Sequence, residues 1–228
     1  MTARYESPAD AVRLRGWLWR PSAALMTVWF RTALRMRVRG REHVPRTGAV
    51  LIVCNHLSNI DPPLVGWAAR PRRSFYMAKS ELFGNRLGAW IISSLGAFPV
   101  VRGGADRNAL RVARDLLARG ESVLMFPEGT RSRTGLLRAA FPGAGSLGLE
   151  EGITIVPAAL WGSQHRFGPV HVVFGPPVST EGLAPGSRGA RAIELTRRMM
   201  QAIADLVPAV GGPPQVVNDG QPSLEKDA

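Results

Sequence analysis

Residues 49–61 read AVLIVCNHLSNID, an uninterrupted apolar run followed at once by a polar segment. A continuous apolar run of this length, rich in β-branched residues, is typical of a buried strand. The prolines at 62 and 63 break any helix across the segment, so we expect His56 in the turn that leaves the strand. Because open α/β sheets bind ligands at the carboxyl ends of their strands, this turn is a candidate functional site.

His56 and Asp61 lie five residues apart within the predicted turn. A carboxylate that accepts a hydrogen bond from one imidazole nitrogen fixes the tautomer and leaves the other nitrogen free to take a proton. His56 is therefore a candidate general base and Asp61 its orienting partner. The alternative is a histidine and an aspartate that merely stabilise a turn, and this pair alone does not distinguish the two.

A second apolar run, SVLMF at residues 122–126, leads into PEGTRS at residues 127–132. The pattern predicts a strand that ends in a glycine turn flanked by a carboxylate, a hydroxyl and a guanidinium. Exposed backbone amides at such a turn, together with a forked arginine, suit a phosphate group. Two polar turns of this kind, each at the end of an apolar strand, favour a functional site over simple packing.

Cys54 is the only cysteine of the chain, which excludes an intramolecular disulfide. Its place two residues before His56 suggests a thiol nucleophile as one interpretation. However, Cys54 belongs to the apolar run, and buried cysteine commonly serves as a small apolar side chain. We therefore favour burial of this thiol.

The net charge is +12, and residues 1–48 hold ten arginines against three acidic residues. Tryptophans and aliphatic residues alternate with these arginines, a pattern typical of helices at a membrane interface. Pro21 is expected to divide the stretch into a short tryptophan-rich helix and a second helix over residues 23–38. The alternative is an amphipathic helix packed on the domain. Nucleic acid is not expected as a partner, because stacking aromatics on a basic groove are missing.

No run reaches the roughly 18–20 apolar residues that span a bilayer, and no signal-peptide pattern is evident. Further strands are expected at residues 74–78, 97–101, 153–159 and 171–174, and further helices at residues 63–69, 84–95, 106–119, 141–152 and 188–206. From residue 208 the Gly- and Pro-rich composition predicts a disordered tail. No cluster of metal ligands is present in the sequence. We therefore expect a helical segment at residues 1–40, one domain at 41–207, and a tail at 208–228.

Arg102 follows the expected strand at 97–101 and precedes two glycines, as Arg131 follows a strand and a glycine. It is either a second phosphate ligand or a solvated turn residue.

The segments NHLSNID (55–61) and FPEGTRS (126–132) together resemble motifs of the glycerophospholipid acyltransferase family. GAFPVVR (96–102), IVP (155–157) and MAKSELF (77–83) are similar to further segments of that family, in the family's order. The resemblance covers roughly residues 49–180. It implies an α/β domain with a mixed, mostly parallel central sheet flanked by helices, behind an N-terminal two-helix segment that docks on the membrane.

The resemblance also implies an activity: transfer of a fatty acyl group to the free hydroxyl of 1-acylglycerol 3-phosphate, giving phosphatidic acid. His56 would be the general base with Asp61 as its partner, and the acceptor phosphate would lie among Arg102, Glu128, Gly129, Thr130 and Arg131. Acyl-CoA or acyl-carrier protein would be the donor, and no cofactor or metal is expected. The partners would be a lysophospholipid and the bilayer, with the protein peripheral or monotopic on the cytoplasmic face of the cell membrane.

Two alternatives stay open at the level of sequence. The acceptor of the acyl group could be glycerol 3-phosphate, a lyso-ornithine lipid or a glycolipid. The chain could instead be a non-catalytic basic module that binds lipid.

Overall fold

The computed structural model describes residues 16–85, 89, 92–93, 96–100, 107–165, 168–217 and 220. The side chains of residues 16–23 and of residue 100 are outside this description. Within it, one seven-stranded sheet has the order β1-β7-β6-β2-β5-β3-β4. The strands are β1 (Arg37–Arg39), β2 (Ala49–Cys54), β3 (Ser74–Lys79), β4 (Ala97–Val100), β5 (Ser122–Met125), β6 (Ile153–Trp161) and β7 (His171–Phe174).

Five neighbouring strands, β6, β2, β5, β3 and β4, run parallel to one another. At one edge β7 pairs antiparallel with β6, and β1 pairs parallel with β7. The predicted mixed, mostly parallel sheet is thus confirmed. Since parallel neighbours require crossover connections, the helices between these strands cover the faces of the sheet.

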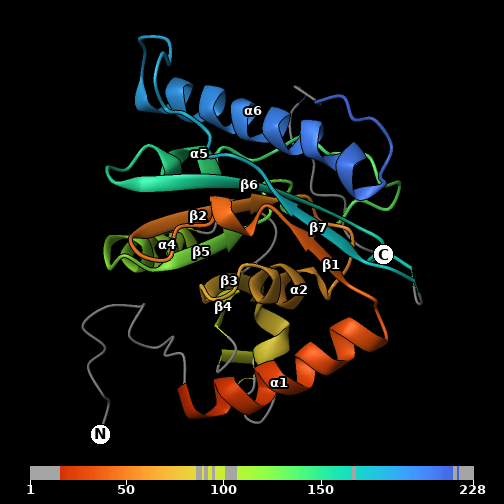
Figure 1. Cartoon of the computed structure of the whole chain (residues 1–228). Helices are drawn as coiled ribbons and strands as arrows, with labels where there is room; N and C mark the ends of the chain where they lie inside the picture. Colours follow the sequence, from red (N-terminus) through yellow and green to blue (C-terminus); the bar gives the residue numbers. More distant parts are fainter. Residues whose placement is uncertain are drawn as a thin grey trace, which may run out of the picture.

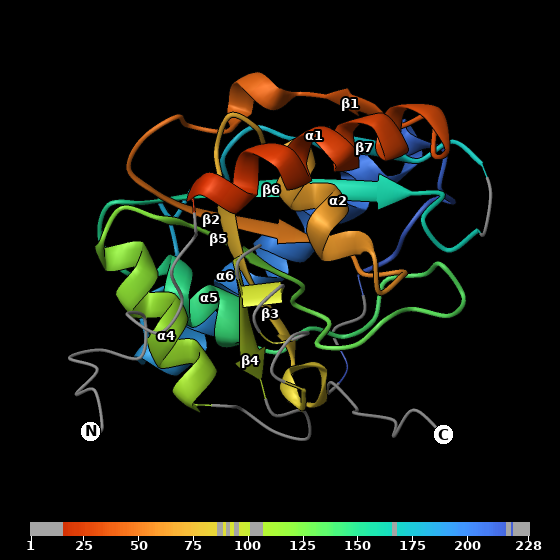
Figure 2. The same cartoon turned by 90° about the horizontal axis from the view of Figure 1, so that it is seen from below.

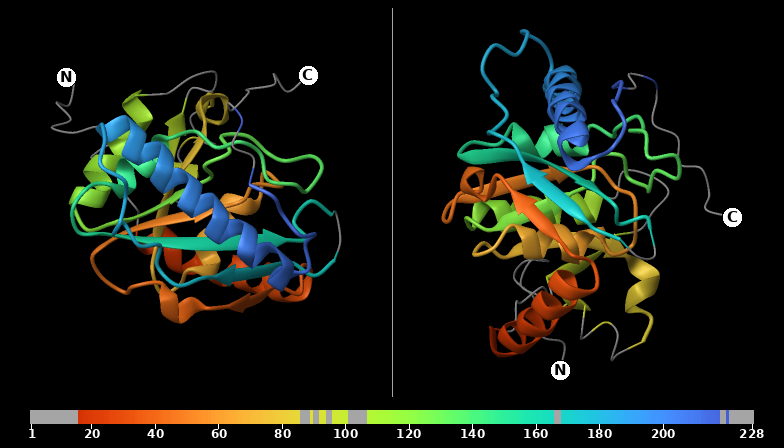
Figure 3. Two further views of the ribbon diagram at one scale, coloured as in Figure 1. Left: turned by 90° about the horizontal axis from the view of Figure 1, so that it is seen from above. Right: turned by 45° about the vertical axis from the view of Figure 1, so that its right-hand side comes forward.

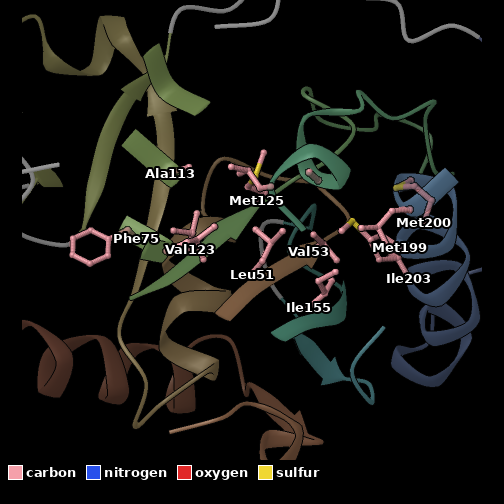
Figure 4. Packing of buried hydrophobic residues seen from close by; sticks show 14 of the residues in the cluster. Leu51, Val53, Phe75, Ala113, Val123, Met125, Ile155, Met199, Met200 and Ile203 are labelled. Atoms are coloured by element: carbon pink, nitrogen blue, oxygen red, sulfur yellow. The ribbon is translucent and has the colours of Figure 1, made fainter. Parts of the chain in front are cut away.

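Alternate residues of β2 point to opposite faces of the sheet, and each face has its own buried cluster. Leu51 and Val53 belong to the cluster with α4 (Arg107–Ala118), α5 (Gly143–Gly148) and α6 (Arg188–Leu206). In Figure 4, Met199 and Ile203 of α6 lie next to this part of the sheet. Val50, Ile52 and Cys54 belong to the cluster with α1 (Gly16–Thr32) and α2 (Asp61–Ala68).

The molecule therefore has three layers. Figure 1 shows α5 and α6 on one side of the sheet and α1 on the other. Seen from below, α1 and α2 lie in front of the strands (Figure 2), and seen from above α6 crosses in front of them (Figure 3). The site-bearing strands β2 and β5 are neighbours in the middle of the sheet, with Val53 opposite Met125. Their carboxyl ends consequently lie side by side.

The prediction of two helices separated at Pro21 is wrong for the described residues, where α1 runs through Pro21 from Gly16 to Thr32. A proline in the second turn of a helix removes one backbone bond, close to the start of the helix, where the first four N–H groups already lack partners. The expected continuation of this helix to residue 38 is also wrong. The chain instead enters β1, and Arg37 lies opposite His171 of β7. Residues 1–15 are outside the described part of the chain.

The expectation of a disordered tail from residue 208 does not hold for its first residues. The short helix η4 (Val207–Val210) buries Val207 and Val210 against the core. The chain then continues along the domain as far as residue 217. Residues 218, 219 and 221–228 are outside the described part, as is most of the helix expected at 84–95. No helix among the described residues is long and apolar enough to cross a membrane.

Candidate active site

His56 and Asp61 meet at the junction of β2 and α2. His56 Nδ1 lies 2.8 Å from Asp61 Oδ2. The same oxygen accepts the backbone N–H groups of Leu57 and Ser58, each at 2.6 Å. Because Asp61 Oδ2 already accepts two backbone N–H groups, we assign it as the acceptor from the imidazole too, so that the neutral ring of His56 carries its proton on Nδ1 and its lone pair on Nε2. The structure thus brings the predicted pair together in the predicted arrangement.

The start of α2 explains why Asp61 takes this place. Asp61 is the first residue of α2, and its N–H closes a turn on the carbonyl of Ser58 at 3.1 Å. Prolines are tolerated in the first turn of a helix, where the N–H groups lack partners, so Pro62 and Pro63 start this helix rather than breaking it. A carboxylate in the first turn is also favoured by the helix dipole.

The His56 ring is held from one side by Phe126, the residue that follows β5. The two ring centroids are 4.2 Å apart and the planes are inclined by 24°. His56 is 6% exposed, and no described residue bonds to its Nε2. The imidazole is therefore fixed in orientation, while its Nε2 stays available to a further partner.

Glu128 joins the two turns. Its carboxylate accepts the backbone N–H of His56 on Oε1 at 2.9 Å and that of Arg138 on Oε2 at 2.8 Å. Burial raises the pKa of the Glu128 carboxyl to about 7, although both N–H groups and the charge of Arg138 act in the opposite direction. Glu128 was predicted to lie around the acceptor phosphate. Both of its oxygens instead hold backbone of the site itself.

The turn after Glu128 depends on glycine. Gly129 has φ +69°, and a Cβ at this position would come within 2.8 Å of the Phe141 ring. Ser132 N–H then bonds to the carbonyl of His56 at 2.7 Å, which fastens the turn to the histidine loop. Of the predicted phosphate ligands here, Thr130 is buried and Arg131 half-buried. Arg102 lies outside the described residues.

The chain matches the family model described as Acyltransferase over residues 35–161, more than half of its length. The chain belongs to the acyltransferase family.

Curated relatives and a solved structure agree with this assignment. The chain is 31% identical to 1-acyl-sn-glycerol-3-phosphate acyltransferase alpha of Mus musculus, over 76% of this chain and 65% of that protein. It is 27% identical to 1-acyl-sn-glycerol-3-phosphate acyltransferase of Bacillus subtilis (strain 168), over 75% of this chain and 87% of that protein. The chain spans just under two thirds of the mouse relative.

The crystal structure of the 1-acyl-sn-glycerophosphate (LPA) acyltransferase PlsC from Thermotoga maritima superposes with a TM-score of 0.62. The superposition covers 81% of this chain and 76% of the Thermotoga maritima chain, at 23% sequence identity. The two proteins therefore share a fold.

Cys54 of this acyltransferase is not placed as a nucleophile. The thiol is fully buried, and Sγ lies 3.6 Å from Asn55 Oδ1. Burial, with the carboxylates of Asp61 and Glu128 nearby, raises the pKa of the Cys54 thiol well above its ordinary value. The thiolate that nucleophilic attack requires is thus strongly disfavoured.

Two residues that hold the acyltransferase site were not predicted as site residues. Asn55 bonds through its amide to both the N–H and the carbonyl of Leu160, at 2.9 and 3.0 Å, and so fixes the histidine loop to β6. Phe126 supports the imidazole face. The sequence indicates that Asn55 needs a hydrogen-bond partner, because it is a polar residue next to a buried strand. Nothing in the sequence identifies that partner, which is the backbone of Leu160, 105 residues away.

No group of three potential metal ligands among histidine, cysteine and acidic side chains occurs in the described part of the acyltransferase.

Proposed function

We propose that this acyltransferase moves a fatty acyl group from acyl-CoA or acyl-carrier protein to the free hydroxyl of 1-acylglycerol 3-phosphate. The product would be phosphatidic acid, a precursor of phospholipids. The observation that carries the proposal is the His56–Asp61 pair at 2.8 Å, with His56 Nε2 unbonded among the described residues. The names of the mouse and Bacillus relatives support lysophosphatidic acid as the acceptor.

His56 acts as the base on the acceptor. Its Nε2 takes the hydroxyl proton while the acceptor oxygen attacks the thioester carbonyl, an effect worth about 10²–10⁴ in rate. The tetrahedral intermediate then collapses, the C–S bond breaks, and the leaving thiolate receives the proton from Nε2. Asp61 stabilises the imidazolium, and no acyl-enzyme is needed.

The oxyanion of this intermediate requires a hydrogen-bond donor near His56. The N–H groups of His56, Leu57 and Ser58 are already bonded to the carboxylates of Glu128 and Asp61. Gly129 N–H bonds to Phe126 O. The N–H of Thr130 bonds to none of the described residues, so we assign it as the backbone donor to the oxyanion.

The acceptor phosphate is assigned to the turn at residues 129–131, together with Arg102. Gly129 gives the turn its shape, the Thr130 hydroxyl is the second donor, and the Arg131 guanidinium is suited to two parallel bonds to phosphate oxygens. Glu128 keeps the turn in place but does not touch the anion in this proposal, since both of its oxygens hold backbone N–H groups.

The bilayer contact is assigned to α1. Leu25, Val28 and Trp29 are 73%, 60% and 45% exposed, and their spacing places them on one side of the helix. Phe30 points the other way, fully buried with its ring edge-on to Trp67 at 5.5 Å. Arg31, in the last turn of α1, and Arg35, which follows the helix, are both exposed. An exposed apolar stripe with adjacent arginines fits the surface of an anionic membrane, on its cytoplasmic face in our proposal.

Acyl transfer in mixed micelles tests this assignment. Wild type, Arg131→Gln and the control Arg191→Gln on the exposed side of α6 are given lysophosphatidic acid, glycerol 3-phosphate, lysophosphatidylcholine or monoacylglycerol, with either donor. We expect transfer to lysophosphatidic acid, with KM raised about tenfold or more in Arg131→Gln only. Equal use of monoacylglycerol by wild type would contradict a phosphate-directed acceptor site.

A further inference from the structure

The carboxyl-terminal segment at residues 207–217 lies beyond the part of the chain that matches the acyltransferase model. It is anchored at its start, where Val207 is fully buried and Val210 is 3% exposed. Gly212 then passes so close to Trp161 and Val207 that a Cβ there would contact both. The segment continues from this point towards the loop that follows the Glu128 turn.

Gln215 joins this segment to that loop. Its Oε1 accepts the N–H of Leu137 at 2.7 Å, and its Nε2 donates to the carbonyl of Gly135 at 3.1 Å. The same Nε2 also donates to Pro213 O at 2.9 Å, which holds the side chain in its own segment. One side-chain amide thus satisfies a donor and an acceptor of the loop, across 78 and 80 residues of sequence.

The loop at residues 132–138 is fastened to the histidine at both ends. At its start, Ser132 N–H bonds to His56 O at 2.7 Å. At its end, Arg138 N–H bonds to the Glu128 carboxylate, whose other oxygen accepts His56 N–H. Inside the loop, Ser132 Oγ donates to Leu136 O at 2.6 Å and accepts Gly135 N–H at 3.1 Å. Gln215 contacts the loop between these two attachments.

We propose that Gln215 is a positioning residue for the acyltransferase site, because it holds the 132–138 loop closed and so places Arg131 for the anionic acceptor. The part concerning Arg131 rests on the proposed function, whereas the closure of the loop does not. Gln215 acts through backbone of the loop and touches no reacting atom. We call residues 207–217 the strap. All but the first of them belong to the stretch for which the sequence predicts a disordered tail.

Hydrogen exchange tests loop closure without any substrate. Gln215→Ala and the near-isosteric Gln215→Met are compared with the control Gln201→Ala, which removes a glutamine that bonds to Asp205 on the surface of α6. The informative amides are those of Gly135 and Arg138, whose own acceptors, Ser132 Oγ and Glu128, are unchanged. We expect both to exchange about tenfold faster in the two Gln215 variants, as two neutral hydrogen bonds are lost.

Kinetics then separate positioning from simple destabilisation. We expect Gln215→Ala and Gln215→Met to raise KM for lysophosphatidic acid about fivefold to tenfold with kcat within twofold, while Gln201→Ala matches wild type. A lower apparent kcat at unchanged KM would show that the variants merely contain a smaller fraction of folded enzyme. That result would overturn the positioning role. Wild-type exchange at Gly135 and Arg138 would overturn loop closure. If wild type acylated no phosphate-bearing acceptor, the proposed function would be wrong. The exchange measurement would still show whether Gln215 holds the 132–138 loop in place.

Discussion

Asp61 shows how one oxygen can organise a site. Oδ2 accepts three hydrogen bonds, from the imidazole of His56 and from the N–H groups of Leu57 and Ser58. The loop and the imidazole ring of His56 therefore share a single acceptor oxygen. Such charge-assisted bonds are shorter and stronger than neutral ones. The sequence predicts the pairing of His56 with Asp61, because five residues of separation suit a turn, but the two backbone bonds depend on a conformation that no residue pattern specifies.

Glu128 has a structural role that its motif does not indicate. It was predicted to lie near the acceptor phosphate, whereas its buried carboxylate holds the histidine loop and Arg138. A carboxyl whose pKa is higher in the folded than in the unfolded state binds more protons when folded. Its contribution to stability is therefore greatest at low pH and falls as the pH rises from about 4.5 to about 7.

Glu128→Gln should remove this pH dependence, since glutamine does not titrate. The free energy of unfolding of wild type relative to Glu128→Gln should fall by about 3 kcal/mol between pH 4.5 and pH 7. Urea unfolding over pH 4.5–8 measures the difference. The control is Glu194→Gln: Arg197 and Arg198, which bond to Glu194, lower the pKa of its carboxyl, so no such fall is expected from pH 5 to 8. A constant difference between wild type and Glu128→Gln would show that folding leaves the pKa of the Glu128 carboxyl unchanged, which would contradict this account.

At the scale of the elements, the turn after β5 depends on the absence of a side chain. Gly129 and Gly152 have nearly equal φ values of +69° and +73°, but only Gly129 has the Phe141 ring at the position of a Cβ, while no atom lies within 4 Å at Gly152. The two glycines therefore separate backbone strain from contact.

Alanine at both positions measures that contact. Gly152→Ala should cost about 1 kcal/mol of unfolding free energy through backbone strain alone. Gly129→Ala should cost about 1–3 kcal/mol more and lower acyl transfer, because the Phe141 ring or the turn must shift. Chemical unfolding and acyl transfer of both variants provide the comparison. Equal costs with full activity in both would refute the assigned role of Phe141.

Helix α1 offers a second test at this scale. Leu25→Ser combined with Val28→Ser should weaken binding to anionic vesicles by about tenfold or more, because two exposed apolar side chains lose their burial in lipid. Ile193→Ser on α6 is the matched control, since Ile193 is 62% exposed and α6 covers the opposite face of the sheet. Vesicle co-sedimentation measures both. Equal loss in the control, or no loss in the double variant, would contradict docking through α1.

Elements with a strong local pattern were predictable, and elements that depend on distant partners were not. The apolar runs of β2 and β5 and the amphipathic pattern of α6 identify them without tertiary information. β1 was missed because it has three residues and exists only by pairing with β7, more than a hundred residues later. The strap was missed for the same reason, since Gln215 in a Gly- and Pro-rich stretch gives no local signal.

Across the whole molecule, the geometry of the candidate site depends on sheet topology. The order of strands makes β2 and β5 parallel neighbours, so the two polar turns meet at the carboxyl ends of these central strands. This proximity follows from the sequence once both strands are recognised, because parallel strands align their carboxyl ends. The hydrogen bonds by which Glu128, Ser132 and Asn55 hold the turns could not be predicted from the sequence. Each of them joins segments that are far apart in the chain and become neighbours only on folding.

The central claim is that His56, oriented by Asp61, takes the proton from the acceptor hydroxyl. The most direct measurement is the kcat for acyl transfer to lysophosphatidic acid by wild type, His56→Ala and Asp61→Asn, with His165→Ala as an exposed control. We predict a loss of about 10³-fold or more in His56→Ala, a loss of about 10²–10⁴-fold in Asp61→Asn, and wild-type activity in the control. Comparable activity in wild type and a folded His56→Ala enzyme would contradict the account.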